Sequence, residues 1–150
     1  MAAAFLACAV FAALGSALAG PDPGASLAAL RQPPFALPLA GWMGVGALYY
    51  LGMGTVLYRA LAHPRPDRRG TTALALAVML LNELWNVLLF GARHMPAALV
   101  GLAAFALPLL ALTLRLRRAD GPSFRIAAVY LAWVVLYDLP WMYMLWRLNP

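Results

Sequence analysis

Five long apolar stretches, separated by short polar or proline-rich segments, set the pattern of this chain. They cover residues 1–20, 39–61, 71–92, 96–114 and 124–147. A helix rises about 1.5 Å per residue, so about 20 apolar residues cross the roughly 30 Å of hydrocarbon in a bilayer. The pattern predicts an all-α fold: an integral membrane bundle of five transmembrane helices that forms a single domain over residues 1–150.

The first stretch has two interpretations. It carries no charged side chain and ends in Ala17-Leu18-Ala19, which fits the small-residue cleavage site of a signal peptide. It also lacks a basic start and is as long as a membrane span, so we expect a retained helix and keep cleavage as the alternative. Residues 21–38 contain five prolines and predict a stiff lid loop over one membrane face, with a short helix near 25–30.

The third stretch contains polar side chains at membrane depth. Asn82 and Asn86 lie on one helical face with Trp85, and Glu83 follows Asn82 directly. An amide or carboxyl group that faces lipid costs several kcal/mol unless it is paired, so such groups usually face a bundle interior or a cavity. We therefore expect this face to point toward the other helices.

The last stretch carries an aromatic stripe and a carboxylate. Tyr130, Tyr137 and Trp141 share one helical face, with Trp133 at its edge. Asp138 lies on the same span, two residues before Pro140, which removes a backbone donor from the helix. Two interpretations stay open: Asp138 binds a ligand, or it pairs with Asn82, Asn86 or an arginine and only fixes the helix register.

Composition supports the membrane assignment. The chain is 65% hydrophobic and only 11% charged, with a mean hydropathy of +0.80, which excludes an ordinary soluble domain. Its formal charge of +6 comes from arginines that mostly flank the apolar stretches, so we expect the lipid bilayer and no nucleic acid as a partner.

The distribution of arginines predicts the orientation. Eight lie in or beside loops on one side, against three on the other, Arg31, Arg93 and Arg147. The eight are Arg59, Arg65, Arg68, Arg69, Arg115, Arg117, Arg118 and Arg125. The positive-inside rule then places the N-terminus and loops 62–70 and 115–123 in the cytoplasm.

No catalytic or metal motif stands out. The sequence has no HExxH or CxxC, His63 and His94 fall in loops, and the single Cys8 has no partner for an intrachain disulfide. We therefore assign no catalytic residue, no metal ligand and no required cofactor. A structural or assembly subunit, whose polar residues serve helix packing alone, is one alternative to ligand binding.

The motifs resemble those of the TspO/MBR family of tryptophan-rich sensory or translocator proteins. The family's third-helix motif, L-N-x-x-W-s-x-x-F-F-G, is similar to the segment 81–91, which has Leu81-Asn82, Trp85 and Phe90-Gly91. Its fifth-helix motif, P-Y-x-x-W-V, is similar to 129–134, with Tyr130 and Trp133. The remaining matches are Pro33-Pro34, Pro38, Tyr50, Met53, Gly54 and the closing Leu148-Asn149.

The sequence also departs from the family pattern. Phe35 stands at the loop tryptophan, Leu37 at a loop proline, and Val129 at the fifth-helix proline. The second-helix tryptophan of the family falls on Gly46, and Trp141 stands near an expected asparagine. The loss of an aromatic side chain at Gly46 removes one wall of the pocket that the resemblance implies.

The resemblance implies five transmembrane helices around a pocket under the first loop. It also implies a flat apolar ligand, of which a porphyrin or haem is the first expectation, a sensory or transport role, and a homodimer. A tetrapyrrole-degrading enzyme is the second alternative. Aromatic faces would stack on the ligand while a few polar groups orient it. The expected binding residues are Phe35, Pro38, Tyr50, Asn82, Trp85, Asn86, Phe90, Tyr130, Trp133, Tyr137, Asp138 and Trp141.

Overall fold

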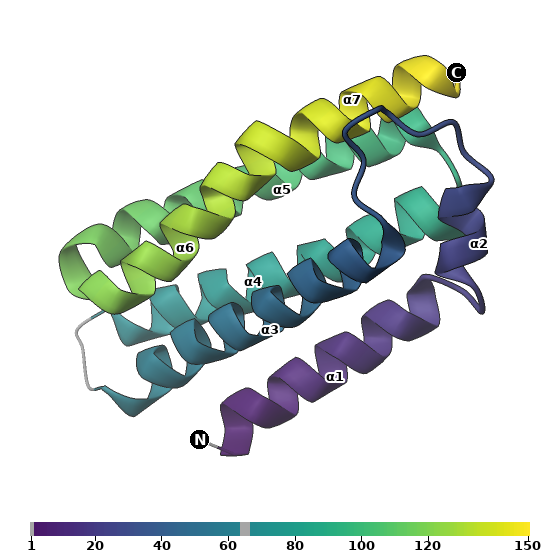
Figure 1. Cartoon of the computed structure of the whole chain (residues 1–150). Helices are drawn as coiled ribbons and strands as arrows, with labels where there is room; N and C mark the ends of the chain where they lie inside the picture. Colours follow the sequence, from purple (N-terminus) through teal and green to yellow (C-terminus); the bar gives the residue numbers. More distant parts are fainter. Residues whose placement is uncertain (1, 64–66) are drawn as a thin grey trace.

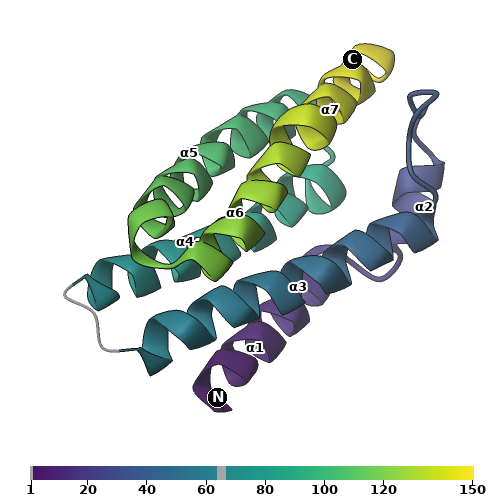
Figure 2. The same ribbon diagram turned by 60° about the vertical axis from the view of Figure 1, so that its left-hand side comes forward.

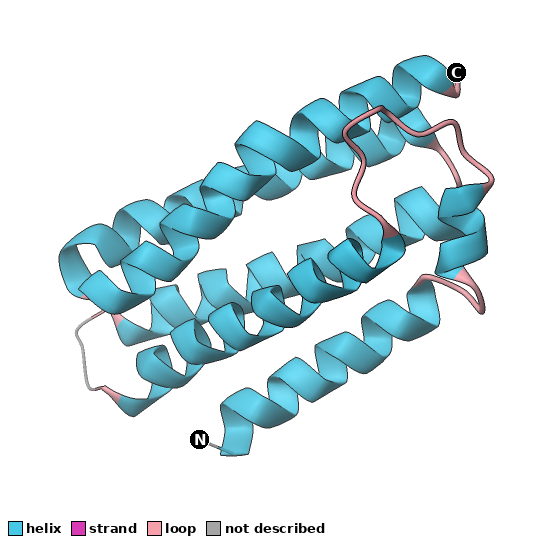
Figure 3. Ribbon diagram, viewed as in Figure 1, coloured by secondary structure: helices cyan, strands magenta, loops and turns pink. Residues whose placement is uncertain are grey.

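The computed structural model describes residues 2–63 and 67–150, and every regular element within them is a helix (Figures 1 and 3). The α-helices are α1 (Ala2–Leu18), α2 (Pro23–Ala28), α3 (Leu39–Ala62), α4 (Arg68–Asn86), α5 (Met95–Ala119), α6 (Gly121–Trp133) and α7 (Leu139–Leu148). Two π-helical segments, η1 (Val87–Gly91) and η2 (Val134–Asp138), continue α4 and α6 without a break. The predicted all-α class is confirmed.

Three helical rods in the described part of the chain are long and apolar enough to cross a membrane. They are Arg68–Gly91, Met95–Ala119 and Gly121–Leu148. α1 is apolar too but has only 17 residues, and the 24 residues of α3 include five glycines and three tyrosines, which lower its hydropathy. An integral membrane bundle is thus supported, while five transmembrane helices remain a prediction.

The rods lie close to the expected ranges, with differences at their ends. α5 continues to Ala119 instead of ending near residue 114, because Arg115, Arg117 and Arg118 favour helix and Asp120 then turns to extended backbone. The short helix of the lid begins earlier than expected, at Pro23, where the Asp22 carboxylate accepts a hydrogen bond from the Ala25 N–H at 2.8 Å. Residues 64–66, with Arg65, lie outside the described residues.

The rods pack as a bundle. α1, α3 and α5 pack along α4, and the α6–η2–α7 rod packs on α5 and α3 (Figures 1 and 2). Inward side chains form a core that leaves no exposed surface at Val56, Val78, Leu109 and Leu112. The outward faces carry exposed aliphatic side chains such as Leu48 and Leu136, as lipid contact requires.

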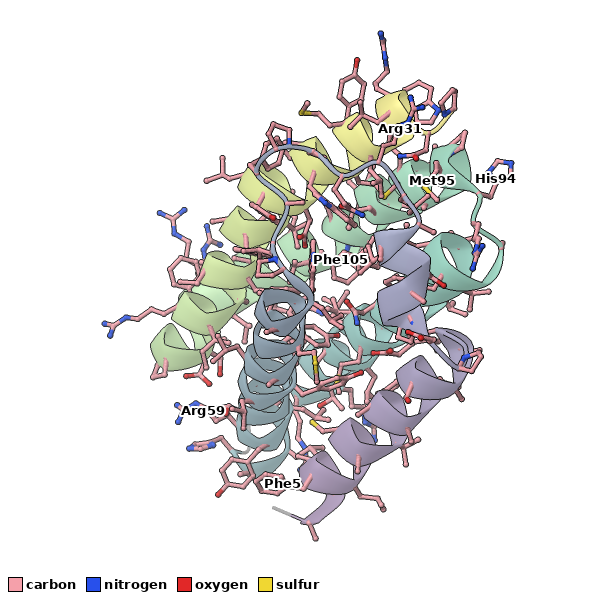
Figure 4. The ribbon with its side chains drawn as sticks, turned by 45° about the vertical axis from the view of Figure 1, so that its right-hand side comes forward. Phe5, Arg31, Arg59, His94, Met95 and Phe105 are labelled. Carbon is pink, nitrogen blue, oxygen red and sulfur yellow. The ribbon has the colours of Figure 1, made fainter. Side chains whose placement is uncertain are left out.

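The two ends of the bundle are closed by different contacts. At one end, Arg59 of α3 holds Asp120 through two hydrogen bonds of 2.8 and 2.9 Å, and the Ser123 hydroxyl donates a third. At the other end, the Arg31 backbone N–H donates to the Asn149 side chain at 3.0 Å and ties the lid to the C-terminus. Figure 4 shows Arg59 near the first end, and Arg31 and His94 near the second.

Both π-helical segments lie in the half of the bundle under the lid. η2 ends immediately before α7, in which Pro140 occupies the first turn and cannot donate a backbone hydrogen bond. The extra residue of a π-turn re-aims the side chains that follow it, which is why such turns are frequent at functional sites. Phe90 of η1 and Asp138 of η2 both line the cavity described below.

Candidate ligand-binding site

A buried carboxylate, Glu83, is the centre of a polar cluster inside the bundle. Its side chain has no exposed surface. The Tyr50 hydroxyl donates to Oε1 at 2.6 Å, and the Asn82 and Asn86 amides donate to Oε1 and Oε2, each at 3.1 Å. The Tyr130 hydroxyl in turn donates to Oδ1 of Asn82 at 3.3 Å. The Glu83 carboxylate, whose hydrogen-bond donors are all neutral, therefore links α3 to α4, and Asn82 links α6 to the same cluster.

Gly15 lets α1 pass directly over this cluster. A Cβ atom added at Gly15 would overlap Oε2 of Glu83, and it would lie 3.4 Å from the Asn86 amide nitrogen. Any larger residue would push the carboxylate off its donors. The glycine is thus required by the polar cluster as much as by the packing of α1 on α4.

Beside the cluster lies a cavity of about 370 Å³ with aromatic walls. Trp42 of α3 and Trp141 of α7 both line it and pack against each other, with ring centroids 4.6 Å apart. Tyr49 packs on Tyr130 at 4.9 Å, and Phe90 lines the side formed by η1. The volume falls within the range of about 300–1,000 Å³ typical of small-molecule sites.

Three residues that line the cavity each have a buried polar atom without a hydrogen-bond partner among the described residues. These atoms are Oδ1 of Asp138, Nε1 of Trp141 and the hydroxyl of Tyr49. These residues are 8%, 1% and 6% exposed, respectively. Buried polar groups are normally paired because an unpaired one costs about 1–3 kcal/mol. Their gathering on one cavity is the pattern expected where a ligand completes the hydrogen bonding.

The lid borders the cavity and is fastened by Tyr137. The Tyr137 hydroxyl accepts a hydrogen bond from the Leu37 N–H at 2.9 Å and donates to the Phe35 carbonyl at 3.0 Å. Its ring stacks on Trp133 with centroids 4.4 Å apart and meets the Phe35 ring edge-on. Pro23 and Leu27 of α2 reach the cavity itself.

Eight of the twelve expected binding residues line this cavity. They are Tyr50, Asn82, Trp85, Asn86, Phe90, Tyr130, Asp138 and Trp141. The other four lie outside its lining. Phe35 and Tyr137 form the lid fastening, Pro38 precedes α3, and Trp133 faces a second groove of about 650 Å³ between α3 and α6. The indole N–H of Trp85 already has a partner within the protein, because it donates to the Ala98 carbonyl of α5 at 3.0 Å.

The alternative pairing of Asp138 is not what the structure shows. Within the described residues, no hydrogen bond joins Asp138 to Asn82, Asn86 or an arginine. Asn82 and Asn86 instead donate to Glu83. Asp138 therefore fixes no helix register through those partners, and it lines the cavity instead.

Sequence reasoning missed three features of the site. Trp42, one helical turn before Gly46, supplies the aromatic wall whose loss was inferred from Gly46, where an added Cβ would meet only open space. Tyr49 was passed over because its neighbour Tyr50, and not Tyr49, matches the family pattern. Gly15 could be recognised only once α1 was placed on Glu83. The i, i+4 spacing of Trp42 and Gly46 was the one signal available in the sequence.

The chain was compared with known proteins. The sequence model of the TspO/MBR family matches residues 4–147, which is nearly the whole chain. No curated protein matched the sequence. The family match includes nearly all of the helical rods and every residue of the cavity. The chain therefore belongs to the TspO/MBR family, and it is an integral membrane protein of the general sensory or ligand-binding kind.

Proposed function

We propose that this protein binds a flat aromatic ligand in the lidded cavity between α3, α4 and the α6–α7 rod. The observation that carries the proposal is the convergence of aromatic walls and unpaired polar atoms on one cavity inside a membrane bundle. Apolar rings would stack on Trp42, Trp141 and Phe90, and polar atoms on the ligand would meet Asp138 and the indole N–H of Trp141.

A tetrapyrrole of the porphyrin or haem type is the ligand that the family resemblance implies. The cavity is near the lower end of the usual size range, so a porphyrin would occupy it only in part and extend under the lid. Arg31 and Arg93 lie at that end of the bundle, where the Arg93 side chain donates to the Ser26 hydroxyl. Guanidinium groups there are suited to the acidic side chains of a porphyrin.

The test is a titration of the detergent-purified protein with protoporphyrin and haem, followed by tryptophan fluorescence. We expect saturable quenching that weakens at least about tenfold in Trp141→Leu, because that ring forms the cavity wall. Trp146→Leu is the matched control, since Trp146 lies outside the cavity lining on the same helix. Equal weakening in both variants would reject this cavity as the site.

A further inference from the structure

The cavity is acidic, and no basic side chain among the described residues balances it. Glu83 and Asp138 both line it, and none of the described lining residues is an arginine, lysine or histidine. The two ion pairs found in the described part of the chain, Arg59–Asp120 and Arg115–Asp67, lie at the far end of the bundle. A ligand that enters the cavity therefore meets carboxylates and no protein cation.

The two carboxylates differ in what they can still bind. Both oxygens of Glu83 already accept hydrogen bonds, from Tyr50, Asn82 and Asn86. Oδ1 of Asp138 accepts none, although the residue is only 8% exposed. Asp138 is thus the cavity-lining carboxylate that has an oxygen without a hydrogen-bond donor among the described residues.

The aromatic walls of the cavity also favour a positively charged ligand. Trp141 follows Asp138 by three residues and shares its helical face, and Trp42 packs on Trp141. Tryptophan faces attract cations through the ring quadrupole, and this attraction is strongest where water is excluded. A cation beside a buried carboxylate favours the ionised form and is attracted by it, whereas an anion in the same site of low dielectric is repelled.

We propose that the cavity selects flat aromatic ligands that carry a positively charged nitrogen, with Asp138 as the counter-ion and Trp42 and Trp141 as the stacking walls. This inference rests on the proposed function, because it specifies the charge of the ligand that the cavity binds. For a porphyrin it requires the acidic side chains to point out of the cavity toward the lid.

The experiment compares two tricyclic probes of similar ring size and opposite charge, 9-aminoacridine and acridine-9-carboxylate. Each is titrated into the full chain in a nonionic detergent at neutral pH. We expect the cation to bind at least about tenfold more tightly than the anion, and Asp138→Asn to reduce this ratio below about threefold. Asp138→Glu retains the charge and should retain the preference for the cation, even if both affinities fall.

The matched control is Asp67→Asn, which removes one carboxylate at the far end of the bundle. Asp67 pairs with Arg115 at 2.5 Å on the surface, so its loss should leave the probe ratio unchanged. A wild-type ratio near one, or a ratio unchanged by Asp138→Asn in a folded variant, would overturn the inference.

Protoporphyrin titrated into the same preparations separates this inference from the proposed function. Saturable porphyrin binding together with a probe ratio near one would reject the charge preference alone. If neither porphyrin nor the two acridines bind saturably to the folded protein, the ligand site and its charge preference both fail.

Discussion

The two halves of the bundle hold their acidic residues in opposite ways. At the end formed by α3, α5 and α6, Asp120 is met by the Arg59 guanidinium and the Ser123 hydroxyl in a closed contact. In the half under the lid, Asp138 has an oxygen without a partner and faces a cavity. The Asp120 carboxylate is paired with a guanidinium, whereas Asp138 has no ion pair among the described residues.

Under the proposed function, the half that contains Asp120 serves the fold and the half under the lid also serves binding. Residues such as Leu109 and Leu112 fill the first half without exposed surface, and the Arg59–Asp120 contact locks α3 to the start of α6. The half under the lid is less densely packed, because it contains the cavity, and it also contains the two π-helical segments and the lid. Substitutions in the first half should change stability alone, whereas those in the second should change ligand binding as well.

The largest expected effect comes from removing the Trp141 ring, which lines the cavity in the half of the bundle under the lid. Trp141 is 1% exposed, so Trp141→Ala should lower the free energy of unfolding by about 3–5 kcal/mol and also weaken porphyrin binding. Thermal unfolding in detergent, followed by circular dichroism, measures the loss. Trp146→Ala should cost less because Trp146 is only partly buried, and an equal loss in both variants would contradict the assigned packing.

Gly15→Ala should be next in size because it forces α1 away from Glu83. Overpacking of this kind costs about 1–3 kcal/mol, and here it also disturbs the carboxylate's donors. Gly46→Ala is the matched control, since its added methyl group meets nothing within 4 Å. Comparison of the two melting temperatures tests this. If the two alanine variants proved equally stable, α1 would not pack on the polar cluster as described.

Ser123→Ala tests whether the half of the bundle that contains Asp120 contributes to stability alone. It removes one donor to Asp120, a hydrogen bond of 2.7 Å, and should destabilise the fold by about 0.5–1.5 kcal/mol. Porphyrin affinity should stay unchanged, because Ser123 lies far from the cavity lining. A fall in affinity without a matching loss of stability would show that the two halves are not separate in function.

Tyr137→Phe should have the smallest effect on stability and a visible effect on kinetics. It removes the hydroxyl that holds the lid at Leu37 and Phe35 but retains the ring that stacks on Trp133. We expect faster ligand release, measured by stopped-flow displacement, with a melting temperature close to that of the wild type. Tyr143→Phe, on the exposed side of α7, is the control and should leave the release rate unchanged.

The sequence predicted the helical rods well because each is a long apolar run bounded by arginines or prolines. It also placed Asn82, Trp85 and Asn86 on one inward face, since helical spacing alone determines which side chains are neighbours. It did not separate Trp133 and Tyr137 from the cavity residues. η2 begins between them and changes the angular spacing of the stripe, and a π-turn has no simple sequence signal.

Contacts between distant segments could not be predicted in the same way. That Glu83 takes its donors from α3 as well as α4, or that Gly15 lies over it, depends on how the rods pack. The glycine at position 46 led us to infer that the pocket loses one aromatic wall, yet Trp42, one helical turn away, supplies that wall. Such compensation is visible only when the neighbouring side chains are placed in space.

The most direct test of the central claim, that the lidded cavity is the ligand site, is to fill it from Gly46. A Cβ at this position meets open space, so the ring of Gly46→Phe should enter the cavity without disturbing the helix contacts. We expect the variant to fold with an unchanged melting temperature and to lose saturable protoporphyrin quenching by at least about tenfold. Porphyrin binding as tight as in the wild type, in a folded Gly46→Phe protein, would contradict the account.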